Sequence, residues 1–176
     1  MSDLPRRAVA AVVAIPLLGW FLFSRTPYPF GAVIVVASLA GLREVFAMLR
    51  KLKFRPFEPV GYAAALACHA AALWEWNLPA SLSILAAPVF LLTVILLALL
   101  LAMLCRGMEK DNVPSVAVTL FAALYAGWLA SFVTRLRVLP EGAQWVFLLF
   151  VLTWTYDTAA YFWGVNFGGP KLWPSV

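Results

Sequence analysis

The sequence predicts an all-α integral membrane protein, a polytopic bundle of about six transmembrane helices. Its 176 residues are 64% hydrophobic and 12% charged, whereas a soluble domain has about 45–50% apolar and about 25% charged residues. Segments of roughly 20 mainly apolar residues recur along the chain, and each can cross a hydrocarbon core of about 30 Å. The basic residues lie at the ends of these segments, so the net charge of +5 indicates contact with membrane lipids and does not indicate nucleic-acid binding.

Six spans follow from the apolar segments and from the polar connections between them. We expect them at residues 7–23, 30–49, 59–76, 81–104, 114–134 and 143–165. The connections carry TPYP, RKLKFRPFEP, NLP, RGMEKDNVP and LPEG, and proline and glycine end helices while charged residues stay in water. The first apolar run follows two arginines but lacks an A-x-A cleavage site, so we expect an uncleaved span and not a signal peptide.

The distribution of lysine and arginine predicts the orientation in the membrane. One side would hold ten of the 13 basic residues: Arg6, Arg7, Arg43, Arg50, Lys51, Lys53, Arg55, Arg106, Lys110 and Lys171. The other side would hold only Arg25, Arg135 and Arg137. Because cytoplasmic loops are enriched in basic residues, we expect both termini in the cytoplasm and a multi-pass protein in the cytoplasmic (inner) membrane.

The third expected span differs from the others in being rich in alanine, and it holds His69, the single histidine of the chain. Small residues let helices approach closely, so this span should be buried in the bundle and not face lipid. A histidine within a span could relay protons, but the sequence favours a packing or hydrogen-bonding role because no second polar partner is evident. The basic run from Arg50 to Arg55 is best explained as a cytoplasmic anchor, and it could also attract an anionic lipid.

The sixth expected span carries a polar stripe. Trp154, Asp157, Thr158 and Tyr161 stand at i, i+3, i+4 and i+7, which places them on one face of a helix. A carboxylate near the centre of a membrane helix costs about 2.5–3.5 kcal/mol even on the lenient insertion scale. The stripe should therefore face a bundle or a wet cavity, with a lysine, a metal ion or polar groups as the partner of Asp157.

The position of Asp157 and the residues that follow it allow two interpretations. At 1.5 Å per residue the carboxylate lies about 21 Å along the helix from residue 143, in the cytoplasmic half, where a hard oxygen ligand suits Mg²⁺. The tail then holds Gly164, Gly168 and Lys171, and a lysine after flexible glycines can pair with phosphate. The alternative is a plain helix end with an Asp–Lys or Asp–Arg pair, and spacing alone does not decide between them.

The same stretch resembles a motif of the phosphatidate cytidylyltransferases, or CDP-diacylglycerol synthases, written W-x-x-D-T-x-A-Y-F-x-G-x-x-F-G-x-x-K-L. The matching positions are Trp154, Asp157, Thr158, Ala160, Tyr161, Phe162, Gly164, Phe167, Gly168, Lys171 and Leu172. Weaker similarities cover the rest of the chain, at Arg6 to Pro16, at Arg43, Glu44 and Phe46, and at Leu124, Tyr125, Gly127, Trp128 and Leu129.

The resemblance implies a reaction and a set of roles. The family converts CTP and phosphatidate into CDP-diacylglycerol and pyrophosphate at the membrane surface, with divalent metal neutralising the phosphates. It implies Asp157 and Lys171 as catalytic residues, with Asp157 as a ligand of Mg²⁺, and a monovalent cation and a homodimer as further candidates. Substrate-binding positions would be Trp154, Thr158, Tyr161, Gly164 and Gly168.

Departures from the family pattern qualify this expectation. Val165 stands where the family often has arginine, and a later signature that supplies most metal and nucleotide ligands does not occur within the 176 residues. We therefore expect residues 1–142 to form five spans, residues 143–176 to form a sixth span and the start of a catalytic region, and the chain alone to have little or no activity. The alternatives are a related CTP-dependent polyprenol or dolichol kinase-like enzyme and a non-catalytic transporter or assembly protein.

Overall fold

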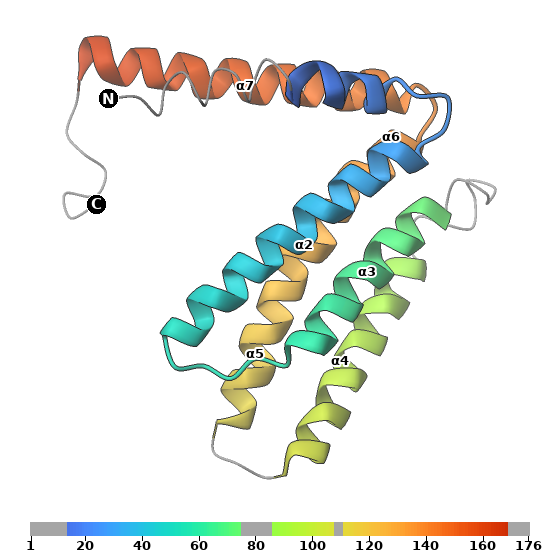
Figure 1. The fold of residues 1–176 in the computed structure, drawn as a ribbon, viewed down its shortest axis with the longest axis vertical. Coiled ribbons are helices and arrows are strands. Elements are labelled where there is room, and N and C mark those ends of the chain that lie inside the picture. The colour runs from blue at the N-terminus through green and yellow to red at the C-terminus, as the bar shows by residue number, and fades with distance from the viewer. Residues whose placement is uncertain (1–13, 75–85, 108–110, 169–176) are drawn as a thin grey trace.

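The described part of the chain is a set of helices without a β-strand, as the sequence predicts (Figure 1). A computed structural model describes residues 14–74, 86–107 and 111–168. Residues 14–22 form a first helix. The elements that follow are α2 (Tyr28–Lys51), α3 (Glu58–Trp74), α4 (Ala86–Arg106), α5 (Asn112–Ala122), η2 (Ala123–Trp128), α6 (Leu129–Val138) and α7 (Gly142–Phe167).

Within the described residues, each of the six expected spans contains helix. Three helical stretches are long and apolar enough to cross a membrane: Tyr28–Lys51, Asn112–Val138 and Gly142–Phe167. The fifth stretch continues α5 through η2 into α6 and ends four residues later than the expected boundary at residue 134. The membrane-protein class is therefore supported, while the count of six crossings and the cytoplasmic location of both termini stay predictions.

Helix α3 lies in the middle of the bundle, as its many alanines predict. It contacts α2, α4, α5, η2 and α6, and buries Gly61, Ala64, Ala65, Cys68, His69 and Ala72. The closest approach is to η2, where a β-carbon built on Gly127 would lie 2.8 Å from the Cβ of Ala65 and 2.9 Å from its Cα. Small residues on both helices thus allow nearly direct backbone contact, which is how membrane helices commonly associate.

A π-helical segment, η2, interrupts the long helix from Asn112 to Val138. It spans six residues, ALYAGW, and π-helical turns are rare insertions in α-helices that often mark functional positions. Within it, the Ala126 carbonyl accepts a hydrogen bond of 2.5 Å from the Ser38 hydroxyl of α2. The segment is therefore tied to α2 by this bond and packed on α3 through Gly127.

His69 has the packing and hydrogen-bonding environment that the sequence favours. It is 1% exposed, and its Nδ1 lies 3.5 Å from the Thr134 hydroxyl of α6, at the outer limit for a hydrogen bond. Its Nε2 has no hydrogen-bond partner among the described residues. Thr134 is the polar partner that the sequence did not identify.

The turn between α6 and α7 fixes the direction in which α7 leaves the bundle. Arg137 is 7% exposed, and its guanidinium donates 2.8 and 2.7 Å hydrogen bonds to the carbonyls of Leu22 and Ser24. A β-carbon at Gly142 would lie 2.3 Å from the Arg137 carbonyl oxygen, so only glycine fits this tight turn. The start of α7 consequently lies beside the first helix, and α7 runs across the end of the bundle where α2 begins and α6 ends (Figure 1).

Candidate functional site

The N-terminal part of α7 is anchored, and the rest of the helix is not. Val146 is fully buried with Leu22 and Phe30, and the Phe150 ring lies 6.5 Å from the Phe30 ring. From residue 151 to residue 168 every position is exposed. The half of α7 that carries the candidate site thus extends past the bundle formed by α2 to α6 (Figure 1).

The predicted polar stripe is present on this exposed half. Because residues 142–167 are continuous α-helix, Trp154, Asp157, Thr158 and Tyr161 share one face, as their spacing predicts. The Trp154 ring is stacked on Phe150, with 5.6 Å between ring centroids, so it is oriented by the anchored part of the helix. Tyr161 is 68% exposed and leaves its hydroxyl open to an incoming group.

Asp157 lacks the partner that a membrane-embedded carboxylate requires. It is exposed and makes neither a hydrogen bond nor an ion pair with any residue that the structure describes. The stripe therefore faces no part of the described bundle, and its expected place against a bundle or wet cavity stays a prediction. Lys171, the other expected catalytic residue, lies outside the described residues, so the alternative of an Asp–Lys pair at the helix end is also undecided.

The two glycines of the predicted site have different local roles. Gly164 is helical, follows Asp157 by seven residues on the same face, and has no atom within 4 Å of the position of a β-carbon. It therefore leaves the stripe open to close approach by a ligand or another backbone. Gly168 ends α7 with φ +63° and ψ −164°, a conformation that is essentially confined to glycine.

The described residues provide one carboxylate for a metal at this stripe and no complete metal site. Across residues 14–74, 86–107 and 111–168, no group of three or more His, Cys, Asp or Glu side chains could hold an ion. Mg²⁺, however, commonly binds one or two carboxylates together with substrate phosphates and water. Asp157 fits that requirement, because it offers one carboxylate and forms no ion pair with a described cation.

A second polar region lies at the C-terminal end of α2. The sequence identified only part of it. The basic run was evident, but two contacts beside it were not: the ion pair of Arg50 with Glu58, and the hydrogen bond from the Phe57 N–H to the Thr119 hydroxyl. The only available signals were an acid eight residues after Arg50 and a threonine in an otherwise apolar span. Neither signal indicates which residue of another segment would be contacted.

Comparison with known proteins assigns the chain to a family. Residues 5–176 match the model of the cytidylyltransferase family. The chain is 27% identical over 180 residues to a phosphatidate cytidylyltransferase of Bacillus subtilis (strain 168), an alignment that covers 100% of this chain and 64% of that protein. The chain thus spans a little under two-thirds of the length of this curated relative, and no solved structure matches it. Since the family model covers nearly the whole chain, the protein belongs to the cytidylyltransferase family.

Proposed function

We propose that this chain supplies membrane-embedded elements of a phosphatidate cytidylyltransferase, with the exposed half of α7 forming one wall of the active site. The observation that carries the proposal is the family match over residues 5–176, which includes the Asp157 stripe. The relative named phosphatidate cytidylyltransferase supports phosphatidate and CTP as the substrates. The reaction would take place at the cytoplasmic face of the inner membrane.

The proposed reaction is a nucleotidyl transfer. An oxygen of the phosphatidate phosphate forms a bond to the α-phosphorus of CTP, the bond between that phosphorus and the bridging oxygen to the β-phosphate breaks, and pyrophosphate leaves. Both substrates are polyanions, so their approach requires compensation of negative charge. Bound Mg²⁺ would supply this compensation and polarise phosphoryl oxygens.

Residues of α7 and of the segment that follows it have separate parts in this scheme. Asp157 would be a ligand of Mg²⁺ because it is an accessible carboxylate without a described partner. Thr158 and Tyr161 would hydrogen-bond substrate oxygens from the same helix face, and Trp154, held by its stacking on Phe150, would position the ligands beside them. Gly164 and Gly168 would allow close approach of phosphate, and Lys171 would pair with it.

A chimera tests this proposal. The aligned part of the Bacillus subtilis relative is replaced by residues 1–176 of this chain, and membranes are assayed for CTP-dependent formation of CDP-diacylglycerol with and without Mg²⁺. We expect the chimera to be active, and Asp157→Asn to lower kcat by about 100-fold or more because a metal ligand is lost. The 176-residue chain alone should form no product, since its described residues contain no complete metal site.

The matched control is Asp111→Asn, the same chemical change at an exposed aspartate whose side chain makes no capping hydrogen bond. Its activity should equal that of the unmodified chimera. Equal activity of the Asp157→Asn chimera would refute the assigned role of α7. A well-expressed chimera that transports a solute or phosphorylates a polyprenol, but forms no CDP-diacylglycerol, would refute the proposed reaction.

A further inference from the structure

The connection between α2 and α3 begins with a defined helix-ending motif. The N–H of Lys53 donates to the Arg50 carbonyl at 2.9 Å, and the N–H of Phe54 donates to the Leu49 carbonyl at 3.1 Å. These two bonds form a Schellman motif, in which the residue at the position of Lys53 adopts a left-handed conformation and is usually glycine. Lys53 has φ +67°, so a lysine occupies a position where the main chain favours a residue without a side chain.

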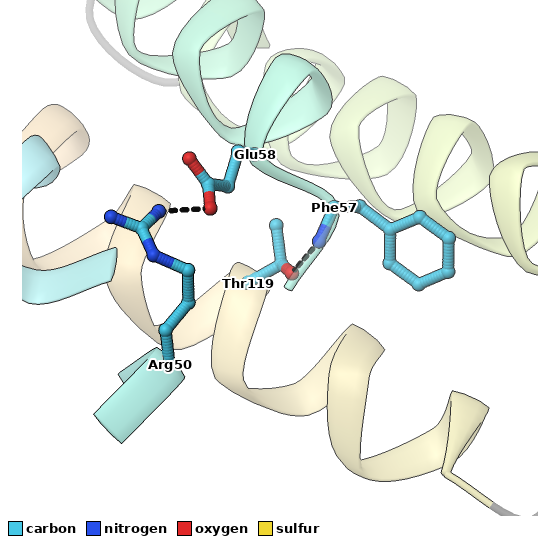
Figure 2. A network of polar contacts seen from close by, with 4 residues as sticks. All are labelled: Arg50, Phe57, Glu58 and Thr119. Atoms are coloured by element: carbon cyan, nitrogen blue, oxygen red, sulfur yellow. Dashed lines mark hydrogen bonds and ion pairs between the residues drawn. The ribbon is translucent and has the colours of Figure 1, made fainter. Parts of the chain in front are cut away.

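The end of the same connection is tied to two other helices. The N–H of Phe57 donates a buried 2.8 Å hydrogen bond to the Thr119 hydroxyl of α5 (Figure 2). The Arg106 guanidinium of α4 lies 3.7 Å from the centre of the Phe57 ring and donates a 2.8 Å hydrogen bond to the Arg55 carbonyl. The backbone is therefore held at both ends, and its side chains project from a fixed frame.

Two of the cations in this region are already used. Arg50 forms an ion pair with Glu58, which lies at the start of α3 (Figure 2). Arg106 stacks on the Phe57 ring and donates its hydrogen bond to the Arg55 carbonyl. Both therefore act within the protein and stabilise the connection.

Three further cations have no such use. Lys51, Lys53 and Arg55 are all exposed, and none of their side chains forms a hydrogen bond or an ion pair with a described residue. No acidic residue occurs between Lys51 and Phe57. Three positive charges that no described acidic side chain pairs with thus stand within five residues, on a backbone that is held at both ends.

We propose that residues 51–55, the cationic turn, bind the phosphate groups of anionic phospholipid headgroups. Lysine and arginine side chains are suitable phosphate partners, and basic clusters beside a membrane helix attract anionic lipids. Leu52 lies between these cations and is 68% exposed, which suits the boundary between headgroups and acyl chains and argues for a lipid over a soluble anion. The lipid need not be a substrate, so the inference does not depend on the proposed transferase reaction.

Lipid binding to the purified chain tests the proposal. Native mass spectrometry in non-ionic detergent would measure binding of phosphatidylglycerol and of phosphatidylcholine with the same acyl chains. We expect a preference for phosphatidylglycerol, and the triple variant Lys51→Gln/Lys53→Gly/Arg55→Gln should bind it about tenfold or more weakly. Binding of phosphatidylcholine should be unchanged.

Lys53→Gly on its own separates a lipid-binding role from a structural one. The variant removes one charge and also places glycine where the left-handed conformation favours it. We expect about fivefold weaker binding of phosphatidylglycerol together with a Tm that is equal or higher. A purely structural role of Lys53 would leave lipid binding unchanged.

Arg25→Gln is the matched control, because Arg25 is an exposed basic residue before α2, at the other end of that helix. It should retain the binding of the unmodified chain. Equal weakening by Arg25→Gln, or no preference of the unmodified chain for phosphatidylglycerol, would overturn the proposal. Displacement of the lipid by glycerol phosphate at equal concentration would also overturn it, since the turn would then bind a soluble anion.

Discussion

Polar side chains within the helices of this protein hydrogen-bond to backbone groups of other segments. Ser38 donates to the Ala126 carbonyl, Thr119 accepts from the Phe57 N–H, and Arg137 donates to the Leu22 carbonyl. Where such groups are buried from water, leaving one of them unsatisfied costs about 1–3 kcal/mol. These side chains therefore join segments that are far apart in the sequence.

Thr119→Val should measure the value of one such contact. The substitution leaves the buried Phe57 N–H without an acceptor, so we expect the free energy of unfolding to fall by about 1–3 kcal/mol. Thermal unfolding in detergent, followed by circular dichroism, gives the comparison. The control is Thr153→Val. Thr153 is exposed, and its hydroxyl donates to the Leu149 carbonyl one turn earlier in its own helix, as the Thr119 hydroxyl does to the Ser115 carbonyl. The control therefore loses the same bond within the helix but no contact with another segment. Equal effects of the two substitutions would show that the Phe57 contact contributes nothing.

At the scale of elements, the contact between α3 and η2 decides how tightly the bundle closes. Gly127→Ala would place a methyl group 2.8 Å from the Cβ of Ala65, closer than two carbon atoms can lie. We expect a loss of about 1–3 kcal/mol in the free energy of unfolding, because the helices must separate or shift. Chemical denaturation in mixed micelles would measure it.

Gly164→Ala is the corresponding control in α7. It is also a helical glycine, but nothing lies within 4 Å of the added methyl group. Alanine favours helix over glycine by about 0.5–1 kcal/mol, so this variant should be as stable as the unmodified chain or slightly more stable. Destabilisation by Gly164→Ala comparable to that by Gly127→Ala would contradict the close contact at Ala65 as the cause.

The positions of the helices could be predicted from the sequence, whereas several of their interactions could not. Apolar length and punctuating residues located all six helical regions, and small residues predicted the central place of α3. The fifth span was expected to end at residue 134. The structure continues the helix to Val138, since Arg137 is buried by its bonds to the carbonyls of Leu22 and Ser24.

The candidate site could be predicted only as far as one helix determines it. Spacing placed Asp157 and Tyr161 on one face, and the helix confirms this. No described residue of another helix lies against the stripe, and periodicity within α7 cannot indicate what would face it. The π-helical segment was not expected either, because its contacts at Ser38 and Ala65 are between distant parts of the chain.

For the whole molecule, the topology in the membrane is the property most open to direct measurement. Fusions of green fluorescent protein or alkaline phosphatase after residues 53, 78, 110, 140 and 176 would report the side of each connection. We expect fluorescence after residues 53, 110 and 176 and phosphatase activity after residues 78 and 140, because basic residues favour the cytoplasm. Phosphatase activity after residue 53 would reverse the predicted orientation and place the cationic turn on the other leaflet.

The contacts of Arg137 also have a consequence for the order of biosynthesis. The first helix is made early, yet its C-terminal carbonyls are satisfied by a residue 115 positions later, and Leu22 is packed against Val146 of α7. The end of the first helix can therefore complete these contacts only after the five described helical regions that follow it have been synthesised. Closing so long a loop is slow and exposes the early helix to premature pairing. Packing of the start of α7 beside the first helix should thus come late in the assembly of the described helices.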